Sequence, residues 1–380
     1  MDFSTQGGVW VPCAGSVTPW QTHLGSEEWP VDAKFFNDQT VFDRKKGDSH
    51  GAVIEQLRYF DYYDGASNAT VTKTKAMELG FYPYQYGYPW ETVVSKDFTE
   101  KTTKLYVHGR QSYEMAYVMP DSKTVYHTDD GTNCVFTMLK LKKEKDLKEG
   151  TLFCMKMTQT SPPGQDAITF TADVNWIEMP TPTHAEVEAA IKTTTFPDLF
   201  DSESCNADFK CSTAGFISIN VGTGCECLKV KAGKEKLASV FEKRRYAAYL
   251  GCTAELYRWE GITYDPDSKK AYTALSNVGL GMLGDDGKTP SQGLDPNDQG
   301  GPNHIKMKAN SCGCVMEMDI DADMKVTKVR MLVCGKKSSA ENPKKMGRFT
   351  DACDVNNIAN PDNVAFIPGA KQVPPASPPL

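Results

Sequence analysis

The 380-residue sequence predicts an all-β fold, a β-propeller interrupted by helices, and three observations support this class. Short runs of alternating apolar residues recur between clusters of Asp, Gly, Pro and Asn, which is typical of many small antiparallel strands. Four such runs fit between Glu114 and Thr160, and they match one propeller blade in length and order. With 40% apolar residues the chain can also build a real core.

The predicted strands follow one another as hairpins. The first group has the strands EMAYVMP, TVYHTDD, CVFTMLKLK and GTLFCMKMTQT, with turns at 121–123 and 131–133. Two further hairpins are predicted at GITYDPDSKKAYTALSNV and at CVMEMDIDADMKVTKVRMLV. In the earlier of these, the residues at 265–268 (DPDS) supply the turn chemistry.

Two helices interrupt this pattern. Thr183 and Glu186 form a predicted capping box before the helical segment AEVEAAIK. Gly233 opens a second helix, KEKLASVFEKRRYAAYLG, which Gly251 can end. We therefore expect one propeller domain over residues 1–368 with a helical insertion at about 183–251. The Pro-rich tail at 369–380 is expected to be disordered.

The net charge and the hydropathy of the chain argue against two classes of partner. The chain has 42 Lys plus Arg and 49 Asp plus Glu, so its formal charge is 42 − 49 = −7. It has no Lys/Arg-rich block of the kind that binds nucleic acid, and no apolar run near the roughly 18 residues of a membrane helix. We therefore expect no nucleic acid and no membrane as partners. An acidic balance suits a protein that gathers carboxylates around metal ions, although most surface acids are merely solvated.

Twelve cysteines favour an oxidising compartment. Cys205 and Cys211 bracket a polar loop, and two C-x-C pairs lie at 225–227 and 312–314. Zinc sites normally use C-x₂-C pairs with a matching second pair, so disulfides are the better interpretation. We expect a secreted or periplasmic protein. Because MDFSTQGGVW is no signal peptide, either the signal has been removed or the chain is a fragment.

The first candidate ligands lie near the N-terminus. Cys13 precedes the adjacent acids Glu27 and Glu28, so a thiol and two carboxylates share one short segment. In a strand the two acids would point to opposite faces, so at most one easily reaches a site shared with Cys13. The alternative is a buried cysteine beside a solvated acidic loop.

Three later segments add acids and one arginine. Glu114 could line the central channel of a propeller, where alternate loops gather. The following residues 129–131 (DDG) read as a common hairpin turn. Arg258 and Glu260 would share a strand face, either as a surface ion pair or as a phosphate site over a metal. Asp362 lies in NPDN, an acid and amide pair whose alternative is a simple turn.

Taken together, these segments resemble the PhoX family of alkaline phosphatases. CAGSVTPWQTHLGSEE resembles that family's opening signature, and HGRQSYEMAYVMPDSKTVYHTDDGTNCVF resembles its G-R-F-x-H-E segment and G-D-D hairpin. LGCTAELYRWEGITYDPDSKKAYTALSN resembles its R-P-E strand, and NPDNVAF its P-D-N segment. The order agrees over most of residues 9–368. Tyr113, Thr128 and Trp259 stand where the family pattern has His, Gly and Pro.

The resemblance implies a six-bladed propeller with a central site of iron and calcium ions that hydrolyses phosphate monoesters. Family members continue beyond both ends of this chain, so its propeller is expected to be incomplete. Arg258 would hold the substrate phosphate as the catalytic and substrate-binding residue. The metal ligands that the resemblance implies are Cys13, as a thiolate on iron, and the carboxylates of Glu27, Glu28, Glu114, Glu260 and Asp362, the last for calcium.

The predicted function is that of a monomeric, metal-dependent phosphomonoesterase acting on small phosphate esters. One alternative is a calcium-stabilised propeller that binds a ligand without catalysis. Another is a calcium-dependent propeller lactonase or phosphotriesterase. Cys13 separates these hypotheses, because a calcium-only protein has no use for a thiolate.

Overall fold

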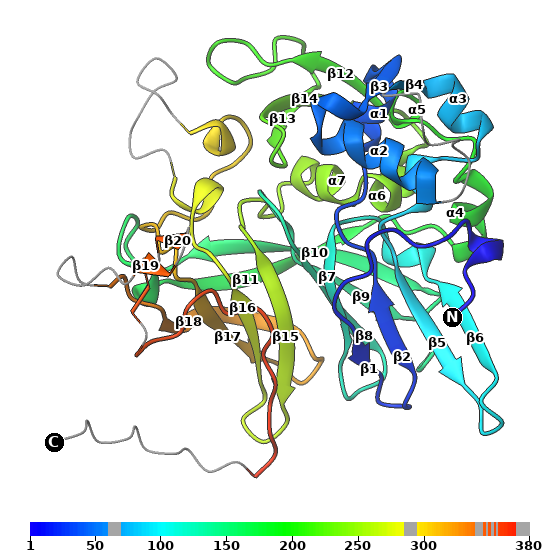
Figure 1. The fold of residues 1–380 in the computed structure, drawn as a ribbon. Helices are drawn as coiled ribbons and strands as arrows, with labels where there is room; N and C mark the ends of the chain where they lie inside the picture. The colour runs from blue at the N-terminus through cyan, green and yellow to red at the C-terminus, as the bar shows by residue number, and fades with distance from the viewer. Residues whose placement is uncertain are drawn as a thin grey trace, which may run out of the picture.

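The computed structural model describes residues 1–59, 70–284, 295–338, 345–346, 349–350, 353–354 and 356–369. Strands dominate, as the sequence predicts, and the largest sheet is antiparallel with nine strands (Figure 1). In spatial order these are β15 (Trp259–Asp265), β16 (Lys270–Leu275), β17 (Cys314–Ile320), β18 (Val326–Cys334), β11 (Thr171–Met179), β10 (Gly150–Gln159), β9 (Thr137–Leu141), β8 (Thr124–Asp129) and β7 (Tyr113–Val118).

Four smaller sheets accompany it. The N-terminal sheet has the order β1 (Ser16–Val17), β2 (His23–Ser26), β5 (Pro89–Val94) and β6 (Glu100–Lys104). A three-stranded sheet has the order β12 (Phe200–Ser204), β14 (Cys225–Val230) and β13 (Ile217–Asn220). The pairs are β3 (Val41–Asp43) with β4 (Thr70–Thr72), and β19 (Lys345–Met346) with β20 (Phe349–Thr350).

Apolar side chains cover both faces of the nine-stranded sheet. Val125 and Leu139 belong to one core cluster, whereas their chain neighbours Tyr126 and Met138 belong to another. This follows from the alternation of side chains along a strand. All six residues of β8 are buried, and the carboxylate of its last residue, Asp129, pairs with Arg244.

The nine-stranded sheet curls until its two ends meet. β15 at one end packs against β7 and β8 at the other. Cys134 N donates to Leu256 O at 2.7 Å, and Arg258 N donates to Gly131 O at 2.9 Å. The predicted blade, β7–β10, therefore does not stand alone, because β11 joins it to the later hairpins in one continuous sheet. This closure brings the starts of β7 and β15 together.

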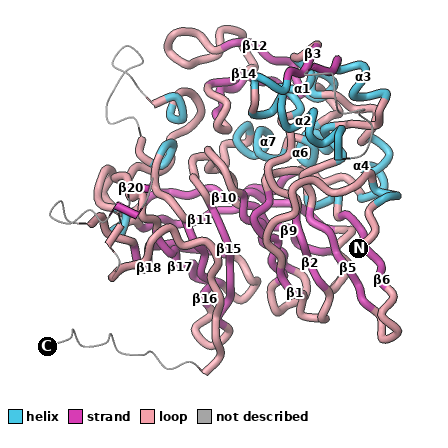
Figure 2. Tube along the Cα trace, viewed as in Figure 1, coloured by secondary structure: helices cyan, strands magenta, loops and turns pink. Residues whose placement is uncertain are grey.

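Helices gather on one side of the sheets (Figure 2). The capping box before α4 is confirmed, since Glu186 N donates to Thr183 Oγ1 and Thr183 N to the Glu186 carboxylate. The single helix predicted after Gly233 is wrong, because the chain leaves helical geometry at Glu242 and forms α6 and α7. The Glu242 carboxylate is buried and accepts from Tyr84 and Arg245. The helices are α1 (Ala33–Asp38), α2 (Asp48–Tyr59), α3 (Lys73–Glu78), α4 (His184–Ala190), α5 (Phe196–Leu199), α6 (Glu235–Phe241) and α7 (Lys243–Tyr249).

Five disulfides confirm the oxidised state predicted for the cysteines. The pairs are Cys154–Cys252, Cys205–Cys225, Cys211–Cys227, Cys312–Cys353 and Cys314–Cys334. Two of them hold the three-stranded sheet β12–β14–β13, so the predicted insertion at 183–251 is partly β rather than purely helical. Residues 370–380 of the predicted tail lie outside the described residues.

No helix among the residues described here is both long and apolar enough to cross a membrane.

Candidate metal centre

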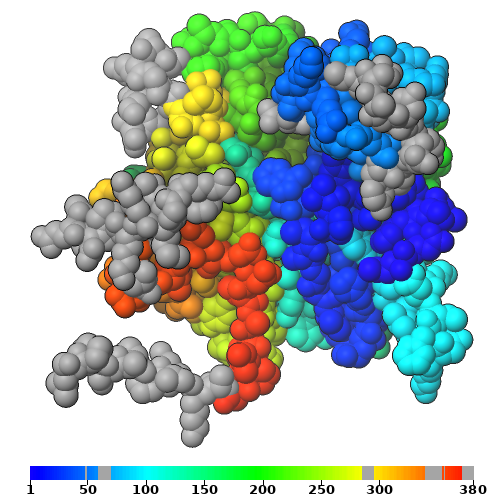
Figure 3. Space-filling view, viewed as in Figure 1, coloured from blue at the N-terminus to red at the C-terminus, as the bar shows by residue number. Residues whose placement is uncertain are grey.

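Five of the predicted ligands meet in one pocket. Its lining includes Cys13 and Glu28 from the N-terminal segment, Glu114 from β7, Glu260 from β15 and Asp362 from the C-terminal segment. Figure 3 shows the N-terminal segment in blue and the C-terminal segment in red side by side on one face of the molecule. The pocket has a volume of about 520 Å³.

The ligand atoms form two groups that share Glu114. The Cys13 sulfur and the carboxylate oxygens of Glu28 and Glu114 lie within 4.8 Å of one another, and so do oxygens of Glu114, Glu260 and Asp362. The Cys13 Sγ is 3.4 Å from Glu114 Oε2. Ligand atoms bind cations at about 2.0–2.6 Å, so groups of this size can each surround one ion.

Both strand glutamates lie at β-bulges. The pairing of β7 with β8 shifts register between Tyr113 and Ala116, and that of β15 with β16 shifts between Trp259 and Ile262. A bulge re-aims a side chain that regular alternation would place elsewhere. Each bulge therefore turns one glutamate, Glu114 or Glu260, toward the pocket where the sheet ends meet.

A glycine lets the C-terminal segment approach β15. A Cβ atom on Gly261 would lie 3.2 Å from Asn363 Cα and 3.2 Å from Asp362 O. Gly261 N donates to Asp362 O at 3.0 Å, and Asn363 Nδ2 donates to Asp362 Oδ1 at 2.9 Å. The close backbone contact holds Asp362 beside Glu260.

Glu27 does not join the cluster, which corrects its prediction as a ligand. Its carboxylate is fully buried and lies 2.8 Å from Lys104 Nζ. It also accepts from the backbone nitrogens of Trp10, Gly87 and Tyr88 at 2.6, 2.8 and 3.0 Å. As alternation along an extended segment predicts, Glu28 reaches the pocket and Glu27 points the other way.

The pKa values of the three glutamates of the pocket are raised, so they resist ionisation as long as no cation neutralises them. Burial, with neighbouring acids, raises the pKa of Glu28 to about 8 and those of Glu114 and Glu260 to about 7. Burial and Glu114 also raise the pKa of the Cys13 thiol. Carboxylates at this spacing repel one another, and bound cations would remove the repulsion. The donor set, one sulfur and several oxygens, therefore fits metal ions.

Arg258 lies at the rim of the same pocket. It precedes β15 in a left-handed conformation with φ of 52°, and its side chain is 45% exposed. The guanidinium is 4.0 Å from Asp130 Oδ2. A fork of N–H groups above a metal pair can bind phosphate oxygens in two places.

Asp130 is a pocket residue that sequence reasoning assigned only to a turn. It lines the pocket and is one of the neighbours that raise the pKa of Glu28. The preceding Asp129 points away, where Arg244 Nε and Nη2 donate to its carboxylate at 2.9 and 2.5 Å. The Asp-Asp-Gly turn thus holds Asp129 on Arg244 and places Asp130 in the pocket. In the sequence, the resemblance to a G-D-D hairpin was the signal that could have identified Asp130 as a site residue.

Comparisons with known proteins bear on this pocket. A family model described as alkaline phosphatase PhoX matches residues 1–371. The structure is similar to that of Pseudomonas fluorescens PhoX in complex with vanadate, a transition state analogue, with a TM-score of 0.54 and 17% identity. The match covers 95% of this chain and 54% of that one, so the chain spans about half the length of that structure. A comparison with curated proteins found no match. The structural likeness supports the predicted all-β, propeller-type fold.

Proposed function

The chain belongs to the PhoX family of alkaline phosphatases, and from this premise we propose that its pocket hydrolyses phosphate monoesters with the help of metal ions. The observation that carries the proposal is the pair of ligand groups joined at Glu114, with Arg258 at the rim. Phosphoryl transfer mainly requires positioning and stabilisation of charge. A pocket with two cation sites and one arginine is suited to both.

The two ligand groups differ in chemistry. Cys13, Glu28 and Glu114 combine a soft thiolate with carboxylates and would hold ferric iron. Glu114, Glu260 and Asp362 offer only hard oxygens and would hold calcium. When bound, the cations supply positive charge that neutralises the phosphate and polarises its P–O bonds.

The protein residues supply orientation. Arg258, whose side chain is 45% exposed, donates to phosphate oxygens from the rim of the pocket. Asp130 lies 4.0 Å from the arginine and aims its guanidinium toward the pocket. We further propose that the protein works in a secreted or periplasmic setting, because five disulfides favour an oxidising compartment.

Elemental analysis together with a phosphatase assay tests this proposal. The purified chain should contain iron and calcium and should release p-nitrophenol from p-nitrophenyl phosphate at alkaline pH. A chelator should abolish the activity, and adding the metals back should restore it. Full activity in metal-free protein, or metal-loaded protein without any phosphatase activity, would contradict the proposal.

A further inference from the structure

One serine contacts both the strand and the C-terminal segment that carry two of the three all-oxygen ligands. Ser276 directly follows β16 and is 8% exposed. Its Oγ donates to the Glu260 carboxylate, its backbone nitrogen donates to Arg258 O at 3.2 Å, and its backbone oxygen accepts from Asn360 Nδ2 at 2.9 Å. Ser276 is not among the residues that line the pocket, so it supports the metal centre from behind.

The hydroxyl of Ser276 restricts the Glu260 carboxylate without occupying it. A carboxylate has two oxygens with about four lone-pair sites, so one accepted hydrogen bond leaves sites for a cation. Ligating side chains are commonly oriented by hydrogen bonds of this kind, and loss of such a partner typically costs about 10–100-fold in metal affinity. The β-bulge turns Glu260 toward the pocket, and the hydroxyl then fixes the orientation of its carboxylate.

Asn360 fastens the C-terminal segment to the same serine. Its Nδ2 donates to Ser276 O and to Ser311 O, both at 2.9 Å, and its backbone nitrogen donates to Cys312 O at 2.8 Å. Asn360 has a left-handed backbone conformation with φ of 46°, which asparagine adopts more readily than most residues. These bonds fix the chain two residues before Asp362 and so place that ligand at the pocket.

The ligand group with the thiol is held by other contacts. The backbone nitrogens of Cys13 and Glu28 donate to Ser26 O and Val11 O at 3.1 and 2.9 Å. All four residues belong to the N-terminal segment, so these bonds do not involve the chain after β16. The two ligand groups therefore have separate supports, although they share Glu114.

We propose that Ser276 and Asn360 are positioning residues of the calcium group, in which Ser276 orients the Glu260 carboxylate and Asn360 places Asp362. The inference rests on the metal centre of the function proposed above. Neither side chain touches the cation or the substrate. Each acts through the ligand that it holds, so loss of either side chain weakens calcium binding and spares the iron group.

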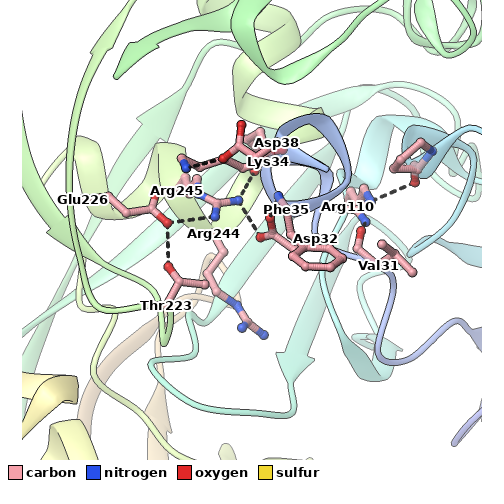
Figure 4. Close-up of polar contacts among 12 residues, drawn as sticks. Val31, Asp32, Lys34, Phe35, Asp38, Arg110, Thr223, Glu226, Arg244 and Arg245 are labelled. Atoms are coloured by element: carbon pink, nitrogen blue, oxygen red, sulfur yellow. Dashed lines mark hydrogen bonds and ion pairs between the residues drawn. The ribbon is translucent and has the colours of Figure 1, made fainter. Parts of the chain in front are cut away.

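A second contact between a hydroxyl and a carboxylate, away from the metal centre, provides a matched control. Thr223 Oγ1 donates to Glu226 at 2.6 Å, and Figure 4 shows both residues beside Arg245. The Arg245 guanidinium lies 2.8 Å from Glu226 and 2.8 Å from Asp32, so a protein cation neutralises this acid. Thr223→Ala removes the same kind of hydrogen bond as Ser276→Ala, but from an acid outside the pocket of the ligands.

Calcium titration of the iron-loaded chain measures the positioning role. A calcium-selective chelator removes bound calcium, and calorimetry after removal of the chelator gives the Kd for added calcium. Ser276→Ala and Asn360→Gly should each raise this Kd about 10–100-fold. Glycine keeps the left-handed backbone of Asn360 without its amide. Iron per chain, measured by elemental analysis, should not change in either variant.

Two further variants separate positioning from a general loss of stability. Thr223→Ala should leave the calcium Kd unchanged, because its hydroxyl supports no metal ligand. Ser276→Thr retains a hydroxyl and should restore most of the calcium affinity that Ser276→Ala loses. Equal loss of iron and calcium in Ser276→Ala, or no recovery in Ser276→Thr, would show a general structural role and overturn the positioning role of the hydroxyl.

The same titration distinguishes this inference from the proposed function. Unchanged calcium affinity in Ser276→Ala and in Asn360→Gly would overturn the inference, while phosphatase activity of the wild-type chain would still support the function. If the wild-type chain binds calcium, loses affinity in both variants and yet hydrolyses no phosphate ester, the proposed function fails and the positioning role stands. A wild-type chain that binds no calcium would contradict both.

Discussion

At the scale of single residues, the proposed chemistry depends most on a thiol. Cys13 is one of two cysteines without a disulfide, and its sulfur lies 3.4 Å from the carboxylate that joins both ligand groups. The other is Cys134, which is fully buried away from the pocket lining. The position of Cys13, rather than cysteine content as such, therefore argues for a transition metal such as iron, since calcium prefers oxygen ligands alone.

Cys13→Ser should remove iron and spare calcium. A serine hydroxyl is a harder and weaker ligand than a thiolate, whereas the oxygen group of Glu114, Glu260 and Asp362 stays intact. The affinity for iron should fall at least about tenfold, the scale seen even when a residue that only supports a ligand is changed, and elemental analysis should show less iron per chain. Cys134→Ser is the control and should retain iron. A calcium-dependent lactonase or phosphotriesterase would instead keep its activity in Cys13→Ser.

Glu260→Ala and Arg258→Ala should affect different properties, the first metal binding and the second phosphate binding. Loss of the acid should lower calcium content, because Glu260 belongs to the all-oxygen ligand group. Loss of the arginine should leave metal content unchanged and weaken phosphate binding by about 1.5–3 kcal/mol, the scale of a charged hydrogen bond. Inhibition by inorganic phosphate measures the second effect. Full metal content in the Glu260 variant would remove that residue from the site.

At the scale of elements, a buried ion pair holds the N-terminal segment against its sheet. Glu27 follows β2 and Lys104 ends β6, and both side chains have 0% exposure. Cys13 and Glu28 flank this pair, since Cys13 N donates to Ser26 O and Glu28 N donates to Val11 O. Glu27 thus supports the metal centre from outside it.

Lys104→Met should destabilise the protein by about 3–5 kcal/mol, because it leaves the Glu27 charge buried without its partner. Denaturant unfolding measures this loss. The double variant Lys104→Met with Glu27→Gln should recover much of it, since no buried charge remains. Both variants should still bind metal if they fold. Loss of iron in a stable double variant would return Glu27 to the ligand set.

The elements also show which parts of the fold sequence reasoning can reach. The strands β7–β10 and both later hairpins were predictable, because alternation and turn residues are local signals. The break at Glu242 was not, because the buried Glu242 carboxylate accepts from Tyr84, which is distant in sequence and meets it only in the folded protein. The helices α1–α3 were not predicted either, although Asp32 and Thr72 are N-cap residues of α1 and α3.

The candidate site also has residues that the sequence predicted and residues that it did not. Alternation along an extended segment predicted that at most one of Glu27 and Glu28 reaches the site, and this needed no knowledge of the fold, but which of the two does so became clear only from the structure. Asp130 was not predicted as a site residue, because a turn that faces a metal pocket has the same residues as a turn that faces water. The bulges that aim Glu114 and Glu260 also have no sequence signature here, so the two ligand groups became visible only in three dimensions.

At the scale of the whole molecule, the metal centre also connects separate parts of the fold. Its ligands come from the N-terminal segment, from both ends of the curled nine-stranded sheet and from the C-terminal segment. Five acids, with Asp130 included, meet where these parts converge. The same repulsion that favours cations must therefore oppose closure of the sheet in their absence.

Removal of metal should consequently lower the melting temperature of the whole chain. Ligand binding to the folded state alone contributes about 2.7 kcal/mol at a free metal concentration of 100 Kd. Scanning calorimetry of chelated and metal-loaded protein measures the difference, and returning calcium and iron should reverse it. In Glu260→Gln with Asp362→Asn, neutral amides replace two of the repelling acids that border Glu114. The metal-free double variant should melt above the metal-free wild type, while added calcium should no longer stabilise it. Equal melting temperatures of the chelated and loaded wild type would show that these acids close the sheet without cations, and would leave the metal centre without a structural role.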